Sequence, residues 1–409
     1  MTAPRETHST DAPGKVEFVA LMAMLVATVA FSIDAMLPAL PRIGAELAPG
    51  AANRAQLVVG TFILGLGTGI FFVGPLSDSF GRKRVILAGA GVYSAGAALA
   101  WAAPTLELLL AARVLQGLGA AAARIVSLAI IRDLYAGREM ARLVSFVMMV
   151  FTLVPAVAPL VGTGIIALGG WRAIFACFVL FSLATSLWLG FRLAEPLPAE
   201  HRRPFRRAAL WAAVREVLSH PGVRIAIAVQ TLCLATLFSS ISSVQQIFGD
   251  TFGRAESFPY WFFMMALVAG SGSFLNASVV VRLGMRRLIN TALTAQTVLS
   301  AIMVAVFAAG PPEGAGFALY LVWQTTIFFQ AALTLGNLNA LAMEPLGHIA
   351  GMAASVINAM ATVGSILLAV PVGLAFDGTP VPLMAGVLTC VAAGRLLMTR
   401  LARAAQFEG

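Results

Sequence analysis

Charged residues are scarce in this chain of 409 residues: Asp, Glu, Lys and Arg make up 11% of it, against about 25% in ordinary globular domains. Histidine and cysteine are scarcer still, with four and three residues. So few charges at this length exclude a soluble enzyme, and the low cysteine content excludes a disulfide-stapled scaffold. Hydrophobic residues instead make up 59% of the chain, and its mean hydropathy is +0.90. This composition indicates an integral membrane protein.

Long apolar runs separated by short polar turns fill most of the sequence. A helix needs about 20 mostly apolar residues to cross a hydrocarbon core of about 30 Å, and twelve runs reach that length. The turns between them are rich in Gly, Pro and charged residues. The sequence therefore predicts an all-α membrane protein with twelve transmembrane helices. These spans are predicted at residues 17–41, 55–76, 84–104, 107–131, 142–168, 172–192, 222–248, 258–281, 286–309, 315–341, 349–376 and 380–399.

Basic residues outnumber acidic ones by 27 to 18, and their positions predict the orientation of the chain. With a cytoplasmic N-terminus, 21 basic residues fall in cytoplasmic segments or at cytoplasmic helix ends, and four fall outside. This bias agrees with the positive-inside rule. We therefore expect a multi-pass membrane protein with both termini in the cytoplasm. The 25 Arg against two Lys and the abundant Ala indicate a GC-rich bacterium, and hence its inner (cytoplasmic) membrane. The basic excess is then a signal of topology, and nucleic acid is not an expected partner.

The longest polar interruption lies between the sixth and seventh predicted spans, at residues 195–221. It reads EPLPAEHRRPFRRAALWAAVREVLSHP, and its basic stretch with Leu and Trp predicts an amphipathic helix along the inner membrane surface. We interpret it as a cytoplasmic linker. The expected domains are an N-terminal six-helix bundle at 1–194, the basic linker at 195–221 and a C-terminal six-helix bundle at 222–409.

A repeated loop supports this division into halves. Residues 74–84 read GPLSDSFGRKR and residues 277–287 read ASVVVRLGMRR, each between the second and third predicted spans of its half. Gly81 aligns with Gly284, and basic residues follow both glycines. The alignment predicts two pseudo-symmetric bundles. Duplicated halves around a site near the bilayer midplane are the architecture of alternating-access transporters.

Five further segments carry family patterns: SIDAMLPALP (32–41), ARVLQGLGAA (112–121), VPAVAPLVG (154–162), GGWRAIF (169–175) and GHIAGMAASV (347–356). Together with the loop at 74–84, they resemble the major facilitator superfamily over essentially the whole chain. The pattern is most similar to its drug:proton antiporter branch, in the bicyclomycin and chloramphenicol resistance group. One departure is Ala158, where the fifth-helix motif of that branch usually has Gly. The resemblance implies the major facilitator fold, function as a monomer, a proton gradient as the energy source and no cofactor.

The resemblance also implies roles for two groups of residues. In the loop at 74–84, Asp78 would contact the N-terminus of a neighbouring helix, where the helix dipole favours a negative charge. The basic residues of that loop would hold the cytoplasmic side closed; the alternative is that they only set topology. Prolines of the fifth span would bend that helix. The implied gate motif is Gly74, Asp78, Gly81, Arg82 and Arg84, and the implied antiporter-helix bends are Pro155, Pro159 and Gly162.

Ionisable side chains inside a membrane are functional candidates, because each costs about 2.5–3.5 kcal/mol on insertion scales. Among the acids, Asp34 alone lies well inside a predicted span, about 10 Å from its outer end, and Arg113 lies about 9 Å from the same side. The two are therefore predicted to pair, directly or through the substrate. A nearby Arg stabilises a carboxylate, whereas burial stabilises the neutral acid, so we predict that Asp34 and Arg113 couple transport to protons. The alternative is a structural pair that fixes the helix register.

The predicted substrate cavity combines charged and uncharged polar groups. Arg124 lies eleven residues, about three turns, after Arg113; the alternative for it is a packing or loop-anchoring role. Two arginines against one aspartate predict neutral, zwitterionic or weakly anionic substrates over cationic dyes. Amides in the second half are also assigned to the cavity, although such groups usually bond across helices. The predicted cavity residues are Met36, Gln116, Arg124, Gln230, Gln246, Gln324, Gln330 and Asn337.

These features predict proton-coupled secondary active efflux of small organic molecules, such as antibiotics or related metabolites, by alternating access. The expected partners are the small-molecule substrate, protons and the lipid bilayer. A proton-driven importer of a small metabolite and a passive pore are the alternatives. An enzyme is not expected, because the sequence shows no embedded catalytic constellation, no metal-ligand cluster and no ATP-binding loop.

Overall fold

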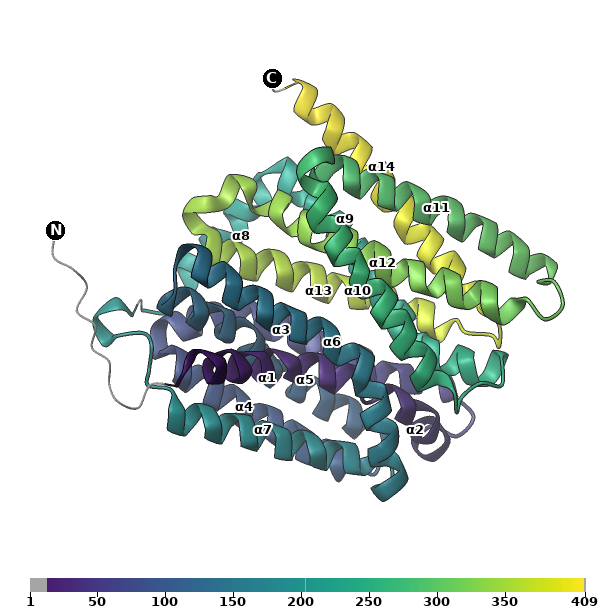
Figure 1. Cartoon of the computed structure of the whole chain (residues 1–409), viewed down its shortest axis with the longest axis horizontal. Coiled ribbons are helices and arrows are strands. Elements are labelled where there is room, and N and C mark those ends of the chain that lie inside the picture. The colour runs from purple at the N-terminus through teal and green to yellow at the C-terminus, as the bar shows by residue number, and fades with distance from the viewer. Residues whose placement is uncertain (1–12, 203, 408–409) are drawn as a thin grey trace.

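The computed structural model describes residues 13–202 and 204–407, with their side chains up to residue 400. The described chain is helical, and its long helices run alternately between two ends of the molecule (Figure 1). We name these ends after residues that lie there. The first helix begins at the Lys15 end, and the loop that follows it lies at the Asn53 end. Two arginines counted for the orientation, Arg5 and Arg203, lie outside the described residues.

The helices before the linker occupy nearly the same residues as the predicted spans. They are α1 Lys15–Asp34, α2 Leu40–Leu47, α3 Leu57–Phe80, α4 Arg82–Trp101, α5 Leu106–Leu134, α6 Gly137–Gly169 and α7 Arg172–Arg192. The short turns η1 Leu37–Ala39 and η2 Ala52–Gln56 flank α2.

The helices from the linker onward also follow the prediction closely. They are α8 Arg207–Ser219, α9 Pro221–Gln246, α10 Phe258–Leu283, α11 Met285–Ala309, α12 Gly316–Met343, α13 Ala350–Leu374 and α14 Val381–Phe407. Three short turns accompany them: η3 Ala199–His201, η4 Ile247–Thr251 and η5 Glu344–Ile349.

The first predicted span, 17–41, lies within the candidate span Lys15–Leu47, but it is not one uninterrupted α-helix, because α1 ends at Asp34. Proline lacks an N–H, and its ring clashes with the carbonyl four residues earlier. For Pro38 that carbonyl belongs to Asp34, and the chain continues instead through η1 and α2. Asp34 therefore sits at a helix end rather than inside a helix.

Within the described residues, length and apolar composition identify eleven helical segments able to cross a membrane. The longest, Gly316–Leu374, has 59 residues and contains α12, η5 and α13. A kink separates its two helices, since Leu346 in η5 has non-helical backbone angles. The chain is thus a multi-pass membrane protein, and this segment is long enough for two of the twelve predicted helices.

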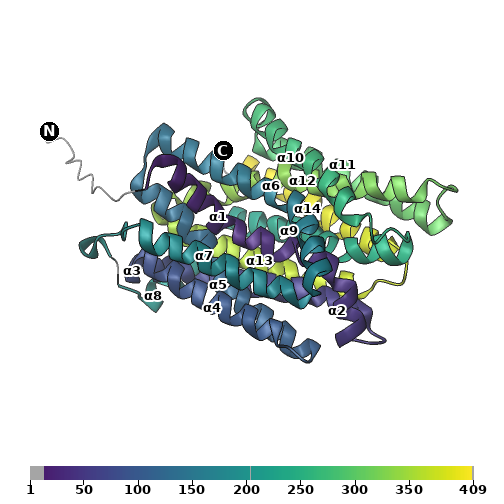
Figure 2. The same ribbon diagram turned by 60° about the horizontal axis from the view of Figure 1, so that its bottom comes forward.

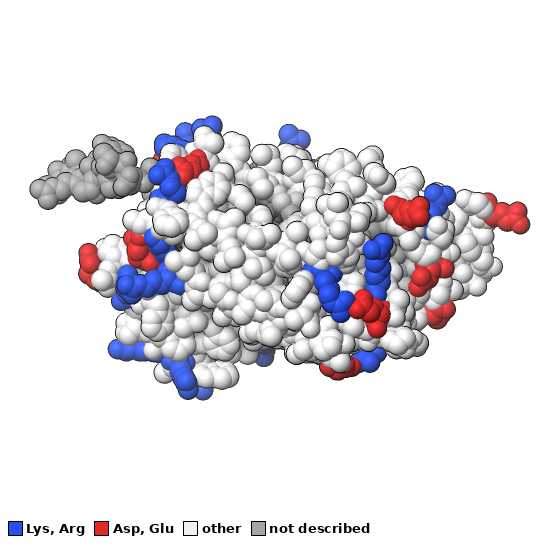
Figure 3. Space-filling model, turned by 90° about the horizontal axis from the view of Figure 1, so that it is seen from below, with Lys and Arg blue, Asp and Glu red and all other residues white. Residues whose placement is uncertain are grey.

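The distribution of charge fits this reading. On the face shown in Figure 3, charged side chains gather toward the two ends of the long axis, and the surface between them is largely uncharged. Large apolar side chains are exposed on the flanks of the helices, among them Leu168, Phe191 and Phe274. Such a surface suits a lipid environment.

The predicted helix of the linker is α8, and its apolar side chains Leu210, Ala213 and Val217 are buried. The helix packs against α9 and α13, so these three side chains contact protein rather than the membrane surface. Trp211 on the same helix is exposed.

Glycines let α5 approach two neighbouring helices at once. A Cβ at Gly117 would lie 2.0 Å from the carbonyl oxygen of Phe62 on α3, and one at Gly119 would lie 2.4 Å from the backbone nitrogen of Tyr93 on α4. Small residues at such crossings allow membrane helices to pack backbone against backbone. The two glycines of the GLG sequence at 117–119 therefore let α5 pack closely between α3 and α4.

The two halves of the chain meet along α3 and α13. Gly60, Gly67 and Gly74 recur at seven-residue intervals on α3, and a Cβ at each would meet a side chain of α13. The contacts run from Val370 opposite Gly60 to Ser355 opposite Gly74, so this seam extends over most of both helices. Helices α6 and α10 form a second contact, and Figure 2 shows α4 and α11 on opposite sides of the molecule.

The repeated loops have matching backbones. Gly81 follows α3 with φ +101° and ψ 153°, and Gly284 follows α10 with φ +79° and ψ 150°. Positive φ is accessible to glycine at little cost. The predicted alignment of Gly81 with Gly284 is therefore confirmed.

We expect Gly117→Ala to reduce stability by about 1–3 kcal/mol, the usual cost of forcing an extra methyl group into a packed site. The new Cβ would overlap the carbonyl of Phe62. Thermal unfolding in detergent would measure the effect. Gly91→Ala on α4 is the matched control, because a Cβ there meets no atom within 4 Å, and an equal loss in both variants would contradict the packing argument.

Candidate functional site

Asp34 is a buried acid at the end of α1. Its side chain is 4% exposed, and Oδ1 has no hydrogen-bond partner. The next residue packs tightly against α6, where a Cβ at Gly162 would lie 2.2 Å from the carbonyl oxygen of Ala35. Gly162 thus allows α6 to approach α1 directly beside the acid.

Arg113 is fully buried on α5 and is held by three helices. Its Nε donates to the carbonyl of Val58 at 3.1 Å, and its Nη2 donates to the carbonyl of Ser32 at 3.0 Å. Its Nη1 donates to Oε1 of Gln116 at 2.7 Å, and the ring of Phe62 lies 4.3 Å away. The guanidinium is therefore bonded to α3, to α1 and to its own helix.

The bond to the carbonyl of Ser32 confirms that Arg113 reaches the level of Asp34. The direct ion pair is not formed, since the described part of the chain contains no ion pair of Asp34. The physical reason is that backbone carbonyls and Gln116 already occupy donors on all three nitrogens of Arg113. In this conformation the acid and the arginine are neighbours without being partners.

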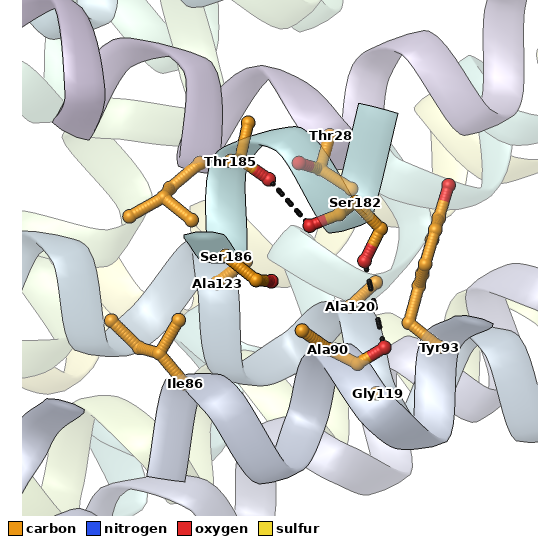
Figure 4. Close-up of a pocket in the computed structure, with 11 residues that line it drawn as sticks. Thr28, Ile86, Ala90, Tyr93, Gly119, Ala120, Ala123, Ser182, Thr185 and Ser186 are labelled. Carbon is orange, nitrogen blue, oxygen red and sulfur yellow. Dashed lines mark hydrogen bonds between the residues drawn. The ribbon is translucent and has the colours of Figure 1, made fainter. Parts of the chain in front are cut away.

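A set of hydroxyl groups lies beside this pair, inside the first half of the chain. Ser32 Oγ and Tyr93 OH are 2.6 Å apart. Tyr93 also lines a cavity between α1, α4, α5 and α7, about the size of one water molecule, where Ser182 Oγ donates to the carbonyl of Ala90 (Figure 4). Ser186 lines the same cavity, and its buried Oγ has no partner. None of these four hydroxyl groups was assigned to the site from sequence.

Arg124 lies over a different helix from Arg113. Its guanidinium carbon is 5.8 Å from the centre of the Phe151 ring on α6, and its side chain is half-buried. Within the described residues it has neither a hydrogen bond nor an ion pair. A cation over an aromatic face is attracted to the ring, yet its N–H donors remain free for another acceptor.

The predicted amides of α9 and α12 are buried and only partly bonded. Gln230 donates to Oδ1 of Asn358 at 3.3 Å, and Gln330 donates to Oγ1 of Thr334 at 3.1 Å. The carbonyl oxygens of both glutamines lack partners, as do both polar atoms of Gln324. Buried polar groups are normally satisfied by protein or water, so these atoms mark places where a ligand or water can bond.

Asn337 and Met36 are the remaining predicted cavity residues, and both contact other protein groups. Asn337 Nδ2 donates to Oδ1 of Asn276 on α10 at 2.7 Å. Met36 is fully buried in the turn between α1 and η1. Both positions are therefore packed between helices in this conformation.

Gln246 lies away from the other predicted cavity residues, at the Asn53 end. Its Nε2 donates to Oδ1 of Asn53 at 2.6 Å, and its Oε1 accepts from Gln56 at 2.6 Å. Gln56 Oε1 in turn accepts from Ser243 Oγ at 3.0 Å. This assembly of amides joins η2 to α9 and was not anticipated, because Asn and Gln in a loop carry no distinctive signal.

The loop at 74–84 forms a compact charged cluster at the Lys15 end. Arg82 is 9% exposed; its Nη1 donates to Asp78 at 2.5 Å and to Ser77 Oγ at 2.6 Å, and its Nε donates to Asp133 at 2.7 Å. Glu195 accepts from the backbone N–H groups of Arg82 and Lys83.

The expected contact of Asp78 with the N-terminus of a neighbouring helix is not formed in this structure. Asp78 bonds Arg82, and Glu195 is the carboxylate at the start of α4, where free backbone N–H groups and the helix dipole favour a negative charge. A Cβ at Gly81 would lie 2.7 Å from Oε2 of Glu195, so this glycine makes room for it. Gly74 faces Ser355 of α13, and Arg84 is exposed.

Helix α6 runs without interruption from Gly137 to Gly169 through Pro155 and Pro159. The bends expected at these prolines are therefore not breaks in the helix. Pro159 and Ala158 are buried, so this part of α6 faces protein rather than lipid.

Comparison with known proteins identifies the family of the chain. The profile of the Major Facilitator Superfamily matches residues 20–369. The chain is 27% identical over 386 residues to the bicyclomycin resistance protein homolog of Haemophilus influenzae, covering 91% of this chain and 93% of that protein. It is 39% identical over 158 residues to a chloramphenicol resistance protein of Pseudomonas aeruginosa, covering 38% of this chain and 37% of that protein.

A solved structure shares the fold. The D-xylose-proton symporter superposes with a TM-score of 0.72 at 16% identity, covering 93% of this chain and 97% of that chain. The resistance proteins named above place the chain beside the drug-efflux group, and members of the matched family are transporters rather than enzymes. On the strength of a profile that spans most of the chain, this protein belongs to the major facilitator superfamily.

Proposed function

We propose that the protein exports small organic molecules across the inner membrane of a bacterium in exchange for protons, by alternating access. The observation that carries this proposal is Asp34, a buried acid with an unpaired oxygen, next to the carbonyl that Arg113 holds. Ionisable groups at membrane depth are costly and mark proton or substrate pathways. No other acid is buried among the described residues.

The proposed topology has twelve membrane-spanning helices in two six-helix bundles. Residues 1–194 form the first bundle, residues 195–221 the cytoplasmic linker and residues 222–409 the second bundle. The Lys15 end faces the cytoplasm, and the Asn53 end faces the periplasm. The excess of basic residues at cytoplasmic positions supports this orientation.

In the proposed cycle, Asp34 takes up a proton while the site is open to the periplasm. It releases the proton while the site is open to the cytoplasm, where the substrate enters. Arg113 stabilises the carboxylate that remains, because the two lie at one level and the loss of a single bond would free a guanidinium donor. A monomer suffices, since each chain contains the whole site.

The proposed substrates carry no net positive charge and have hydrogen-bonding groups. Two arginines, Arg113 and Arg124, oppose cations, and the unpaired oxygens of Gln230, Gln324 and Gln330 accept hydrogen bonds. Relatives named for resistance to bicyclomycin and chloramphenicol support antibiotics or similar metabolites. Import of a small metabolite with protons is the second candidate: the fifth-helix segment favours export, and its departure at Ala158 keeps import as the alternative.

We expect Asp34→Asn to abolish transport driven by a pH gradient while substrate exchange across the membrane continues. The amide resembles the protonated acid in shape but cannot release a proton, so the driving force is uncoupled. Proteoliposomes loaded with a labelled phenicol, with and without a pH gradient, would measure both activities. The matched control is Asp377→Asn in an exposed loop at the Asn53 end.

Gradient-driven transport by Asp34→Asn at the rate of the native protein would rule out Asp34 as the proton carrier. The direction of uphill movement in the same assay separates the two candidates. Movement against the proton flow supports export, and movement with the proton flow supports import. Movement indifferent to the gradient supports a passive pore.

We expect cells producing the protein to resist a neutral phenicol several-fold more than a lipophilic cation such as ethidium. The reason is the unpaired positive charge of Arg124. Arg124→Gln should reduce the difference between resistance to the phenicol and resistance to ethidium. Arg142→Gln on the exposed side of α6 is the control. Drug susceptibility in an efflux-deficient host would measure it; stronger resistance to ethidium would refute the substrate preference.

A further inference from the structure

Four uncharged polar residues connect the two halves of the chain at the Asn53 end. Asn53 and Gln56 belong to η2 of the first half, and Ser243 and Gln246 belong to α9 of the second. We call these four residues the amide latch. Their bonds form an unbroken series: Gln246 donates to Asn53, Gln56 donates to Gln246, and Ser243 donates to Gln56.

The amide latch also reaches α13. Asn53 Nδ2 donates to the carbonyl of Phe376 at 2.7 Å, just beyond the end of α13. Gln56 Oε1 packs against the same helix, where a Cβ at Gly373 would lie only 2.3 Å from it. The side chain of Gln56 is itself buried. Hydrogen bonds and shape therefore hold η2 against both α9 and α13.

The opposite end of the same seam is built differently. At the Lys15 end, Arg82 bonds Asp78 and Asp133, and Glu195 bonds the start of α4, all within residues 13–202. Near that end α3 meets α13 through Gly74 and Ser355, in packing contact. The polar bonds described here between the halves are those of the latch, so they favour closure of the Asn53 end.

We propose that the amide latch closes the Asn53 end in the conformation described and must open and re-form in each transport cycle. Its members are uncharged, and water can take over each of their bonds when the end opens, so the net cost of opening is modest. None of the four latch residues is titratable, and protons act through Asp34 instead. This inference rests on the proposed alternating access.

A single reporter cysteine tests the latch. Ser242 is buried beside Gln56 in a small cavity between α3, α9 and α13, so a Ser242→Cys side chain should react with a hydrophilic maleimide only when the Asn53 end opens. Cys177, Cys233 and Cys390 are first replaced by Ala to leave one thiol. The full-length protein is labelled in lipid nanodiscs, where the reagent reaches both faces of the bilayer.

Two variants break the latch by different means. Gln56→Leu removes the central amide, and Gly373→Ala leaves every latch residue in place but fills the space that Gln56 Oε1 occupies. We expect both to raise the labelling rate about two- to tenfold, the equilibrium effect of losing one or two neutral hydrogen bonds. Ser243→Ala provides a third variant that loses one donor with little change in volume.

Matched controls separate the latch from general loosening. Gln296→Leu removes a buried amide on α11 that bonds Ser300 of its own helix, and Gly336→Ala adds a Cβ that meets no atom within 4 Å. Both should label at the rate of the reporter protein. Unchanged labelling in Gln56→Leu, Gly373→Ala and Ser243→Ala, or equal increases in the controls, would overturn the latch.

The outcome is independent of the transport assay. Faster labelling in the latch variants without any proton-driven transport by the native protein would support the latch and refute the proposed function. Proton-driven transport by the native protein, with unchanged labelling in the latch variants, would support the proposed function and refute the latch. Thermal unfolding of each variant shows whether it is folded, and the second and third latch variants replace Gln56→Leu if that variant is not.

Discussion

The arrangement of the first half depends on one buried cation. Arg113 has no contact with solvent, and carbonyls of α1 and α3 together with Gln116 take the place of water around its guanidinium. An uncompensated buried charge costs several kcal/mol, so none of these helices can shift at this level without leaving a donor unpaired. The close contact of Gly117 with Phe62 brings α5 near enough to α3 for the bond to Val58. The depth of Asp34 is therefore set by an arginine with which it forms no ion pair.

Sequence reasoning predicted the parts of this structure that depend on local signals. Apolar length located the long helices to within a few residues, because burial in lipid acts on each span separately. Distance along a helix placed Arg113 and Asp34 at one level, since the rise per residue is constant, and the bond to Ser32 agrees. The alignment of Gly81 with Gly284 succeeded because a residue with positive φ after a helix is usually glycine, which is visible in the sequence.

The errors concern lateral neighbours and helix ends. Pro38 was present as a signal but was counted within an apolar run, and it ends α1 at Asp34. Gln246 was grouped with Gln230 by helix alone, although 16 residues separate them by about 24 Å along the axis. Asp133 and Glu195 lie in turns far from Arg82 in sequence. Which helices become neighbours is decided by tertiary packing, which hydropathy does not encode.

The seam between α3 and α13 has a mechanical consequence. On the α3 side, the contact includes Gly60, Gly67 and Gly74, which offer no side chains to interlock with those of α13. In most helix pairs, ridges of side chains on one helix pack into grooves on the other. A change in the angle between the two helices therefore requires many side chains to change rotamer. Where glycine faces α13, fewer side chains must rearrange when the angle between the two helices changes. The halves can therefore tilt about this contact, and the polar bonds between them that resist the tilt are those of the amide latch.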